Sequence, residues 1–215
     1  MLEINIITLF PKLFEEYKNV LPINRAIQNN LLKLNIINLR DCAIDKRGTV
    51  DDKPYGGGIG MVLRPEPIYE ALGNIQNKEE VIFLNPKGKI FNQNMAKSLS
   101  QKNSLTFVCG RYEGIDQRVI DLSNGTEVSL GEFVCAGGEA PAQVMIESIV
   151  RLIPGVLDEE AISKESFQED NLEHPQYTRP EEWRGSKVPE VLLSGHHAQI
   201  QKWKEQNSKT NTKTN

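Results

Sequence analysis

The residues best suited to chemistry lie between Cys109 and Arg118, in the segment Cys-Gly-Arg-Tyr-Glu-Gly-Ile-Asp-Gln-Arg. Two arginines, two carboxylates and one aromatic ring surround two glycines, directly after an apolar run. In open α/β sheets, ligands bind beyond the carboxyl ends of strands, which is where we expect this segment to fall. The segment therefore predicts a polar ligand site, and a turn held by salt bridges is the alternative.

Three other segments contain glycines where a ligand could approach the main chain. Val50–Met61 holds three consecutive glycines, a costly arrangement that favours positive φ angles or a close ligand. It is not a Walker phosphate loop, because no Gly-Lys-Ser/Thr follows, and a merely flexible loop is its alternative. Ser129–Pro141 places glycines and apolar residues before a helix, so its backbone could bind an adenine edge. Asn85–Lys89 is a turn after a strand and gives the weakest indication.

Alternating strands and helices are expected to position these loops. Helical spacing follows Pro11, Asn92 can cap a helix through Leu99, and further helices cover Ile115–Leu122 and a buried segment that begins at Pro141. The apolar positions of these helices are Leu13, Phe14, Tyr17, Ile115, Val119, Ile120, Leu122, Val144, Met145, Ile149 and Leu152. The expected strands are Ile4–Leu9, Leu34–Leu39, Val81–Leu84, Leu105–Cys109 and Thr126–Leu130. This alternation predicts an α/β fold with a largely parallel sheet.

The chain changes character after Gly155. Residues 158–173 contain seven acidic residues against one lysine, which predicts a flexible acidic connector. Residues 174–205 form a second small unit whose last part is helical, and residues 206–215 lack core-forming residues and are predicted to be disordered. The chain has a net charge of −4, whereas the part from His174 onward carries +3. That part could meet phosphates, although a solvated helical surface explains the charge nearly as well.

Composition is that of an ordinary globular protein, with 39% hydrophobic and 25% charged residues among 215. No run approaches the roughly 18 apolar residues of a membrane span, and the N-terminus resembles a first strand rather than a signal peptide. We therefore expect a cytoplasmic protein. Cys42, Cys109 and Cys135 form no CxxC pair, so neither a disulfide framework nor a zinc site is expected. Each is expected to be a small buried residue.

Taken together, the motifs resemble one family over about residues 1–205. They are PYGGGxGM, CGRYEGxDxR, GGExPA, RLIPGVL, YTRP and VPEVLLSGxHxxIxxW, and their order is that of the TrmD-type tRNA (guanine-N1)-methyltransferases. The resemblance implies an α/β domain over residues 1–157 whose mostly parallel sheet contains a deep trefoil knot. It also implies a small helical, tRNA-binding domain over residues 174–205, and a homodimer. Ile146, Ile149 and Val150 either help to bury the dimer interface or belong to an ordinary core.

The same resemblance implies the reaction and the cofactor. A methyl group would pass from S-adenosylmethionine to ring nitrogen 1 of the guanine at tRNA position 37, beside the anticodon. The family also responds to Mg²⁺, for which the sequence offers no ligand cluster. The positions that match the family's cofactor loops are Leu84, Pro86, Gly110, Glu113, Leu130, Gly131, Glu132, Phe133, Val134, Cys135, Gly137 and Gly138.

Two residues are implied to be catalytic. Arg151 matches the family's partner of the guanine oxygen, and the family's base is an aspartate in an Asp-Ser-Phe segment. This chain has Lys164-Glu165-Ser166-Phe167 instead, and the spacing from Arg151 is one residue short. Counting from Phe167 makes Glu165 the base, whereas counting from Arg151 points to Ser166. We favour Glu165, because serine cannot act as a base unaided, and Asp170 is a further alternative.

Other positions match substrate contacts of the family. They are Tyr55, Gly57, Gly58, Arg111, Asp116, Ser166, Arg179 and His197. Candidate phosphate contacts are Arg179, Lys187, Lys202 and Lys204. Two other functions compete with methyl transfer: a non-catalytic RNA-binding protein that has lost the base, and a nucleotide-phosphate enzyme that uses the triple-glycine loop. The second is disfavoured, because the Walker lysine and hydroxyl are missing.

Overall fold

The computed structural model describes residues 1–158, 162, 165–167 and 171–210. The chain divides into two compact units, Met1–Leu157 and Asp158–Asn215, and each is described by itself. The alternative base Asp170 and the end of the tail, residues 211–215, lie outside the described residues. Among the helices described, none is long and apolar enough to cross a membrane.

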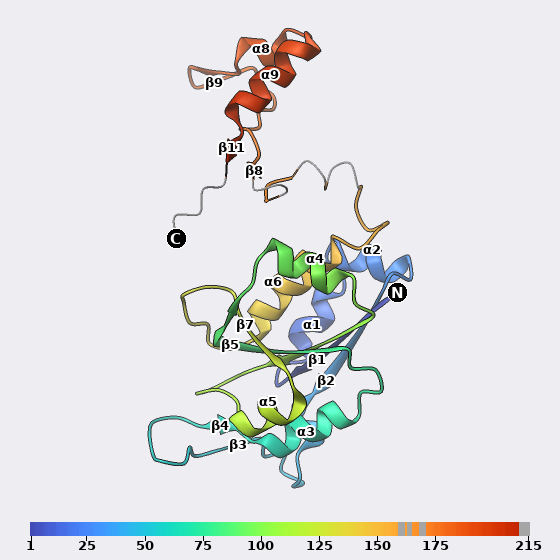
Figure 1. Ribbon diagram of the computed structural model, residues 1–215, viewed down its shortest axis with the longest axis vertical. Coiled ribbons are helices and arrows are strands. Elements are labelled where there is room, and N and C mark those ends of the chain that lie inside the picture. Colours follow the sequence, from blue (N-terminus) through green and yellow to red (C-terminus); the bar gives the residue numbers. More distant parts are fainter. Residues whose placement is uncertain (159–161, 163–164, 168–170, 211–215) are drawn as a thin grey trace. The chain divides into compact units, whose positions relative to one another are not determined.

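The first unit is built on a five-stranded sheet in which every neighbouring pair of strands is parallel (Figure 1). The strand order is β2-β1-β6-β5-β7. The strands are β1 (Leu2–Thr8), β2 (Leu32–Asn38), β5 (Glu80–Ile90), β6 (Ser104–Cys109) and β7 (Thr126–Ser129). All five predicted strands are therefore confirmed, and so is the parallel α/β class. The clearest difference is at β5, which continues six residues beyond the predicted end at Leu84.

Helices cover both faces of this sheet, because neighbouring strand residues point to opposite sides. Ile6 packs in one core and Ile7 in the other. The first core lies under α1 (Lys12–Tyr17), α2 (Ile23–Gln28), α4 (Gln93–Ser100) and α6 (Glu139–Val150). The second lies under α3 (Pro65–Gly73), α5 (Gln117–Ser123) and the 3₁₀ turn η1 (Leu39–Cys42). The result is a three-layer α/β/α arrangement.

The helices confirm some sequence expectations and correct others. The Asn92 side chain accepts a hydrogen bond of 2.9 Å from the Met95 amide, so it caps α4 as predicted. Helix α6 begins two residues before Pro141, which the first helical turn tolerates. The predicted apolar faces are wrong at Leu13, Leu122 and Val144, which are 49%, 72% and 50% exposed. The spacing of apolar residues identified an apolar stripe in each helix, but it did not show which residues of the stripe are covered by other elements.

Three buried residues and three cysteines resolve alternatives left by the sequence. Ile146, Ile149 and Val150 are fully buried in the core of a single chain, so they belong to ordinary core. Among the cysteines, Cys109 is buried as expected and Cys42 is half-buried. The expectation is wrong for Cys135, which is exposed. Cys135 lies in the loop after β7, outside the hydrophobic core.

The ladder of β5 is interrupted after Leu84. Val128 of β7 pairs with both Leu84 and Lys89, so the four residues between them leave the sheet as a small loop. Pairing with β7 resumes at Lys89. A side chain at Gly88, just before it, would collide with the main chain of Glu127 and Val128. The turn predicted at Asn85–Lys89 therefore sits inside a long strand, at the level where β6 and β7 end.

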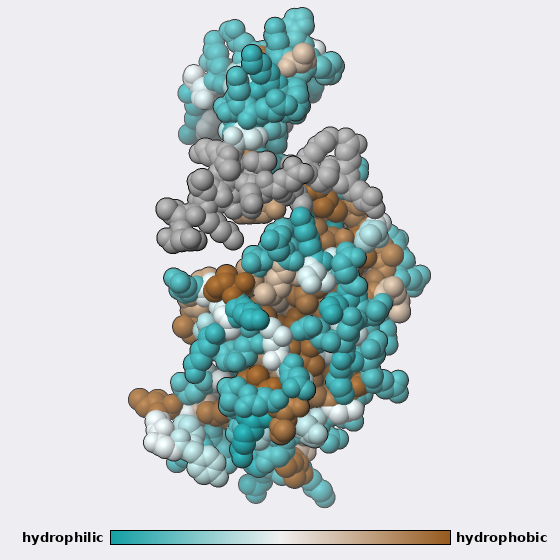
Figure 2. Space-filling view, viewed as in Figure 1, coloured by the Kyte–Doolittle hydropathy of each residue, from teal (hydrophilic) through white to brown (hydrophobic). Residues whose placement is uncertain are grey.

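The second unit is small and contains little core. Residues 171–210 of this unit contain α8 (Glu190–Leu193) and α9 (His197–Asn207), and neither helix contains a buried residue. Two short antiparallel pairs accompany them: β9 (Glu182–Trp183) with β10 (Ser186–Lys187), and β8 (Asn171–Leu172) with β11 (Lys209–Thr210). The helix expected near the end is present as α9. Figure 2 shows a mainly hydrophilic surface on this unit.

Candidate functional site

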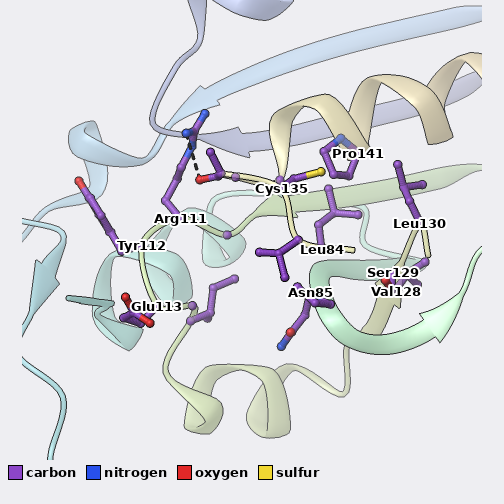
Figure 3. Close-up of a pocket in the computed structure, with 18 of the residues that line it drawn as sticks. Leu84, Asn85, Arg111, Tyr112, Glu113, Val128, Ser129, Leu130, Cys135 and Pro141 are labelled. Atoms are coloured by element: carbon purple, nitrogen blue, oxygen red, sulfur yellow. Dashed lines mark hydrogen bonds between the residues drawn. The ribbon is translucent and has the colours of Figure 1, made fainter. Parts of the chain in front are cut away.

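A cavity of about 220 Å³ lies at the carboxyl ends of β6 and β7 and at the interruption of β5 after Leu84; the three strands are neighbours in the sheet (Figure 3). Parallel strands end at the same edge, so the loops that follow them converge there. The lining residues are Leu84, Asn85, Pro86, Gly110, Arg111, Tyr112, Glu113, Gly114, Ile115, Val128, Ser129, Leu130, Phe133, Val134, Cys135, Ala136, Gly137, Gly138 and Pro141. Apolar side chains and exposed backbone thus share the walls.

Glycines allow the backbone segments around this cavity to approach one another closely. The Gly138 amide donates a hydrogen bond of 2.8 Å to the Gly110 carbonyl. A Cβ atom on Gly138 would lie 2.8 Å from the Cys109 Cα, closer than side-chain carbons normally come. A Cβ on Gly110 would lie 3.2 Å from the Leu84 carbonyl oxygen. The three loops therefore meet through their main chains, which leaves backbone groups available to a ligand.

A buried ion pair fixes two of these loops to the sheet and to α6. Glu139, only 2% exposed, accepts hydrogen bonds of 2.8 Å from the Thr8 hydroxyl and from the Arg111 guanidinium. Arg111 also donates to the Ala136 carbonyl at 3.2 Å, and its guanidinium carbon lies 4.4 Å from the centroid of the Phe10 ring. The arginine predicted to contact substrate therefore already holds the loops that form the cavity.

The triple-glycine loop joins β3 (Asp51–Asp52) to β4 (Val62–Leu63), which form an antiparallel pair. Gly56, Gly57, Gly58 and Gly60 all have positive φ, as the run of glycines predicted. The loop base is fixed, because the Glu113 amide donates to the Met61 carbonyl at 2.9 Å. Its tip is open: Tyr55 is 98% exposed, and a Cβ on Gly56 or Gly57 would meet nothing within 4 Å.

Two titratable groups near the cavity serve local structure. Burial raises the pKa of the Cys109 thiol well above its ordinary value, and Glu139 adds to the effect, so the thiol stays neutral. Asp116 caps α5, and Arg118 donates to its carboxylate at 2.7 Å. This hydrogen bond holds the pKa of Asp116 below its ordinary value. Asp116, predicted as a substrate contact, is thus engaged with its own helix.

The comparisons with known proteins identify the family. A family model described as tRNA (Guanine-1)-methyltransferase TrmD matches residues 2–215. The chain belongs to the TrmD family. A Clostridium perfringens (strain 13 / Type A) protein named tRNA (guanine-N(1)-)-methyltransferase is 52% identical over 215 residues, covering 99% of this chain and 90% of the relative. Proteins of the same name from Clostridioides difficile (strain 630) and Dictyoglomus turgidum (strain DSM 6724 / Z-1310) are each 48% identical. The alignments cover 95% of this chain in both cases, and 91% and 84% of those relatives.

The structure brings most positions that match the cofactor loops of the TrmD family into one cavity. Ten of the twelve line it, and Gly131 and Glu132 do not. Arg111, matched to a substrate contact, also lines it. The resemblance to the family did not point to eight other residues that line the cavity: Asn85, Tyr112, Gly114, Ile115, Val128, Ser129, Ala136 and Pro141. Each of these lies within a few residues of a matched position, so its place after a predicted strand was the available indication.

The two residues implied to be catalytic belong to different units of the chain. Arg151 forms the carboxyl-terminal cap of α6, whereas Pro141, in the first turn, lines the cavity. Ten residues of helix separate them, about 15 Å along the axis. Glu165 belongs to the second unit.

The remaining positions matched to TrmD substrate contacts lie in the second unit. The Ser166 hydroxyl contacts the Glu173 carboxylate at 3.3 Å and accepts from the Glu173 amide at 3.1 Å. Arg179 lines a hollow of about 380 Å³ within that unit, and His197 is the first residue of α9. Among the residues described, no group of three or more His, Cys, Asp or Glu side chains could hold a metal ion.

A wider groove of about 620 Å³ lies on the opposite side of the sheet from α6, between η1, α3 and α5. Its walls include Cys42, Tyr69 and Leu122, with the acidic Glu66 and Glu70. Burial raises the pKa of the Cys42 thiol, and the negative charges of Glu70 and Asp41 add to this. The lining of the groove contains no glycine and none of the positions matched to the family's cofactor loops.

Proposed function

We propose that this chain transfers a methyl group from S-adenosylmethionine to ring nitrogen 1 of the guanine at position 37 of tRNA. The observation that carries the proposal is the glycine-lined cavity at the ends of β6 and β7 and the interruption of β5, in a chain of the TrmD family. The relatives named tRNA (guanine-N(1)-)-methyltransferase support the same chemistry. Position 37, the donor and a cytoplasmic location rest on the resemblance, and so does any role for Mg²⁺.

The chemistry of the cavity suits the proposed donor. Leu84, Leu130 and Phe133 provide apolar surface for an adenine ring, and free backbone groups between glycines provide hydrogen bonds for its edge. The Glu113 carboxylate lines the same cavity and can attract a positive charge. S-adenosylmethionine supplies an electrophilic methyl group when bound. A side chain at Gly138 or Gly110 would fill the space where the loops meet.

The acceptor needs a base as well as a position. Guanine nitrogen 1 carries a proton near neutral pH and becomes nucleophilic when a carboxylate removes it. We assign this step to Glu165, and we assign Arg151 to the guanine oxygen on which negative charge grows. Glutamate has nearly the intrinsic pKa of aspartate, about 4.3 against 3.9, so the change from the family's aspartate preserves the chemistry.

A second copy of the chain would complete the site. Within one chain, Arg151 and the cavity lie at opposite ends of α6. An exposed apolar patch crosses α1 and α6 at Phe10, Leu13 and Val144, each about half exposed. The two helices are joined there, because Gln143 donates to the Leu13 carbonyl at 3.1 Å. Exposed apolar patches mark interaction sites, and we propose that this one forms the homodimer interface.

The knot belongs to the same proposal. The interruption of β5 and the loops after β6 and β7, which line the cavity, are the segments that a knotted sheet of this family would cross. Chains rarely thread through their own loops, so a knot would fix the cavity against local opening. The part of the second unit from His174 onward, which carries a net charge of +3, is proposed to bind the tRNA.

Label transfer tests the proposed function. Purified full-length chain is incubated with S-adenosylmethionine labelled in the methyl group and a tRNA transcript that carries guanine at position 37. We expect label in the wild-type transcript and none in a transcript with adenine there. No transfer to either transcript would remove the enzyme assignment and leave the non-catalytic RNA-binding alternative.

Thermal-shift measurements distinguish the proposed methyltransferase from the second alternative, a nucleotide-phosphate enzyme. S-adenosylmethionine and its demethylated product should raise the melting temperature, because ligands that bind the folded state stabilise it. ATP and GTP should not. Protection by ATP or GTP alone would favour a nucleotide-phosphate enzyme.

A further inference from the structure

The strand pair β9–β10 is a tight hairpin. Trp183 pairs with Ser186 and Glu182 with Lys187, so only Arg184 and Gly185 form the turn. Both turn residues have positive φ, 53° and 82°. This is the two-residue turn whose twist matches antiparallel strands, and an arginine in its first position is uncommon. The turn fixes the side chains on either side of it.

Trp183 is presented at the surface by this hairpin. Its side chain is 62% exposed, and the Arg184 guanidinium carbon lies 4.8 Å from the centroid of its ring. The other tryptophan behaves differently: Trp203 is partly buried, and its ring contacts the rings of Tyr177 and His174. The unit therefore uses one tryptophan for packing and leaves the other in water.

Arg184 lies at this exposed ring, and two further cations, with the acidic Glu181, line the hollow beside it. Trp183 lines the hollow of about 380 Å³ together with Tyr177, Arg179 and Lys187. Lys187 also pairs with Glu182 at 3.6 Å, and both of these side chains are well exposed, so water weakens the pair. An aromatic face beside arginine and lysine matches proteins that bind unpaired nucleotides, where bases stack on rings and cations follow the phosphates.

We propose that Trp183 is a stacking platform for an unpaired nucleotide of the tRNA, with Arg179, Arg184 and Lys187 beside its phosphates. This rests on the proposed function and adds the place where the second unit recognises a loop. Bases inside a duplex present their edges, whereas bases in a loop expose their faces. The site should therefore prefer the loops of the tRNA to its stems.

Affinity measurements with the full-length chain test the proposal. Trp183→Ala should weaken tRNA binding about tenfold, and Trp183→Phe should restore most of it. Trp183→Ala should leave the salt dependence unchanged, because no phosphate contact is lost. Lys187→Ala should reduce the salt slope by roughly 0.7. Tyr69→Ala removes an aromatic ring of similar exposure, 60%, from the first unit, and should bind like wild type.

Fluorescence gives a second readout that does not depend on a disruptive variant. In a Trp203→Phe background, Trp183 is the sole tryptophan of the chain. A stem–loop RNA should quench its emission and protect it from acrylamide, and a fully paired duplex of equal length should do neither. Steady-state assays should show a raised KM for tRNA in Trp183→Ala, with kcat unchanged.

The outcomes separate this inference from the proposed function. If wild-type chain binds no tRNA in these titrations, the proposed function itself fails. If wild type binds tRNA but Trp183→Ala binds equally well, or Trp183 stays open to acrylamide in the complex, the stacking platform is wrong and the function stands. Equal protection by the paired duplex would also overturn it.

Discussion

At the scale of single residues, the proposed chemistry depends on one carboxylate that differs from the family's. Glu165 stands where the resemblance places an aspartate, and the extra methylene lengthens its reach. A carboxylate can take the proton from guanine nitrogen 1, whereas an amide of the same shape cannot.

We expect Glu165→Gln to lower single-turnover methyl transfer by about 100-fold or more. Calorimetry should show nearly unchanged affinity for S-adenosylmethionine, because Glu165 is not among the positions matched to the family's cofactor loops. Glu165→Asp is the matched control and should retain activity. Wild-type rates in Glu165→Gln would transfer the role of base to another residue, such as Asp170.

Gly138 is a second residue whose identity carries a physical requirement. A methyl group there would press on the main chain at Cys109 and Gly110, at 2.8 and 2.9 Å, and neither can rotate away. We expect Gly138→Ala to destabilise the fold by about 1–3 kcal/mol and to weaken binding of S-adenosylmethionine.

Urea unfolding and calorimetry measure these two effects. Gly73→Ala is the control, since a Cβ at Gly73 meets nothing within 4 Å and the residue ends a helix. Tight binding of S-adenosylmethionine by a stable Gly138→Ala chain would contradict a backbone-lined site.

At the scale of elements, α5 is held at its start by a charged cap. Asp116 accepts from the Arg118 amide and guanidinium, and this hydrogen bonding lowers the pKa of Asp116. The folded chain therefore binds fewer protons at this site than the unfolded chain. Its contribution to stability is present above the unfolded-state pKa of about 3.9, and is lost as pH falls through the lower folded-state pKa.

Asp116→Asn keeps a capping side chain but removes the charge. We expect it to unfold at lower urea than wild type at pH 7, and to lose less stability on acidification. Arg118→Gln should also reduce the loss of unfolding free energy on acidification, because it removes the same ion pair. If both variants lose as much unfolding free energy as wild type on acidification, the pair contributes nothing to the pH dependence of stability.

The loops of the cavity depend on elements that are distant in sequence. Glu139 is the first residue of α6, yet its carboxylate accepts hydrogen bonds from Thr8 of β1 and from Arg111, which follows β6. The buried pair thus connects three elements at one edge of the sheet. Sequence spacing alone gave no reason to join these residues.

At the scale of the whole molecule, the proposal requires two copies. We expect Val144→Glu to produce a monomer by light scattering and to abolish methyl transfer, because it places a charge in the apolar patch on α1 and α6. Leu122→Glu is the matched control: it is an equally apolar, 72% exposed position on α5. That variant should remain a dimer, and a dimeric, active Val144→Glu would remove this patch from the interface.

Much of the fold followed from the sequence. Short β-branched runs and the helices between them predicted all five strands of the sheet, because the periods of strand and helix are local properties of the chain. Ordered glycine motifs at strand ends indicated the family and ten residues of the cavity.

Only the tertiary structure decided which residues meet and which are covered. The double pairing of Val128, the ion pair of Arg111 with Glu139, and the exposure of Leu122 and Val144 each depend on neighbours far along the chain. A local pattern shows that a side chain is apolar or charged. What packs against it is set by the register and crossing of distant elements, which no local period encodes.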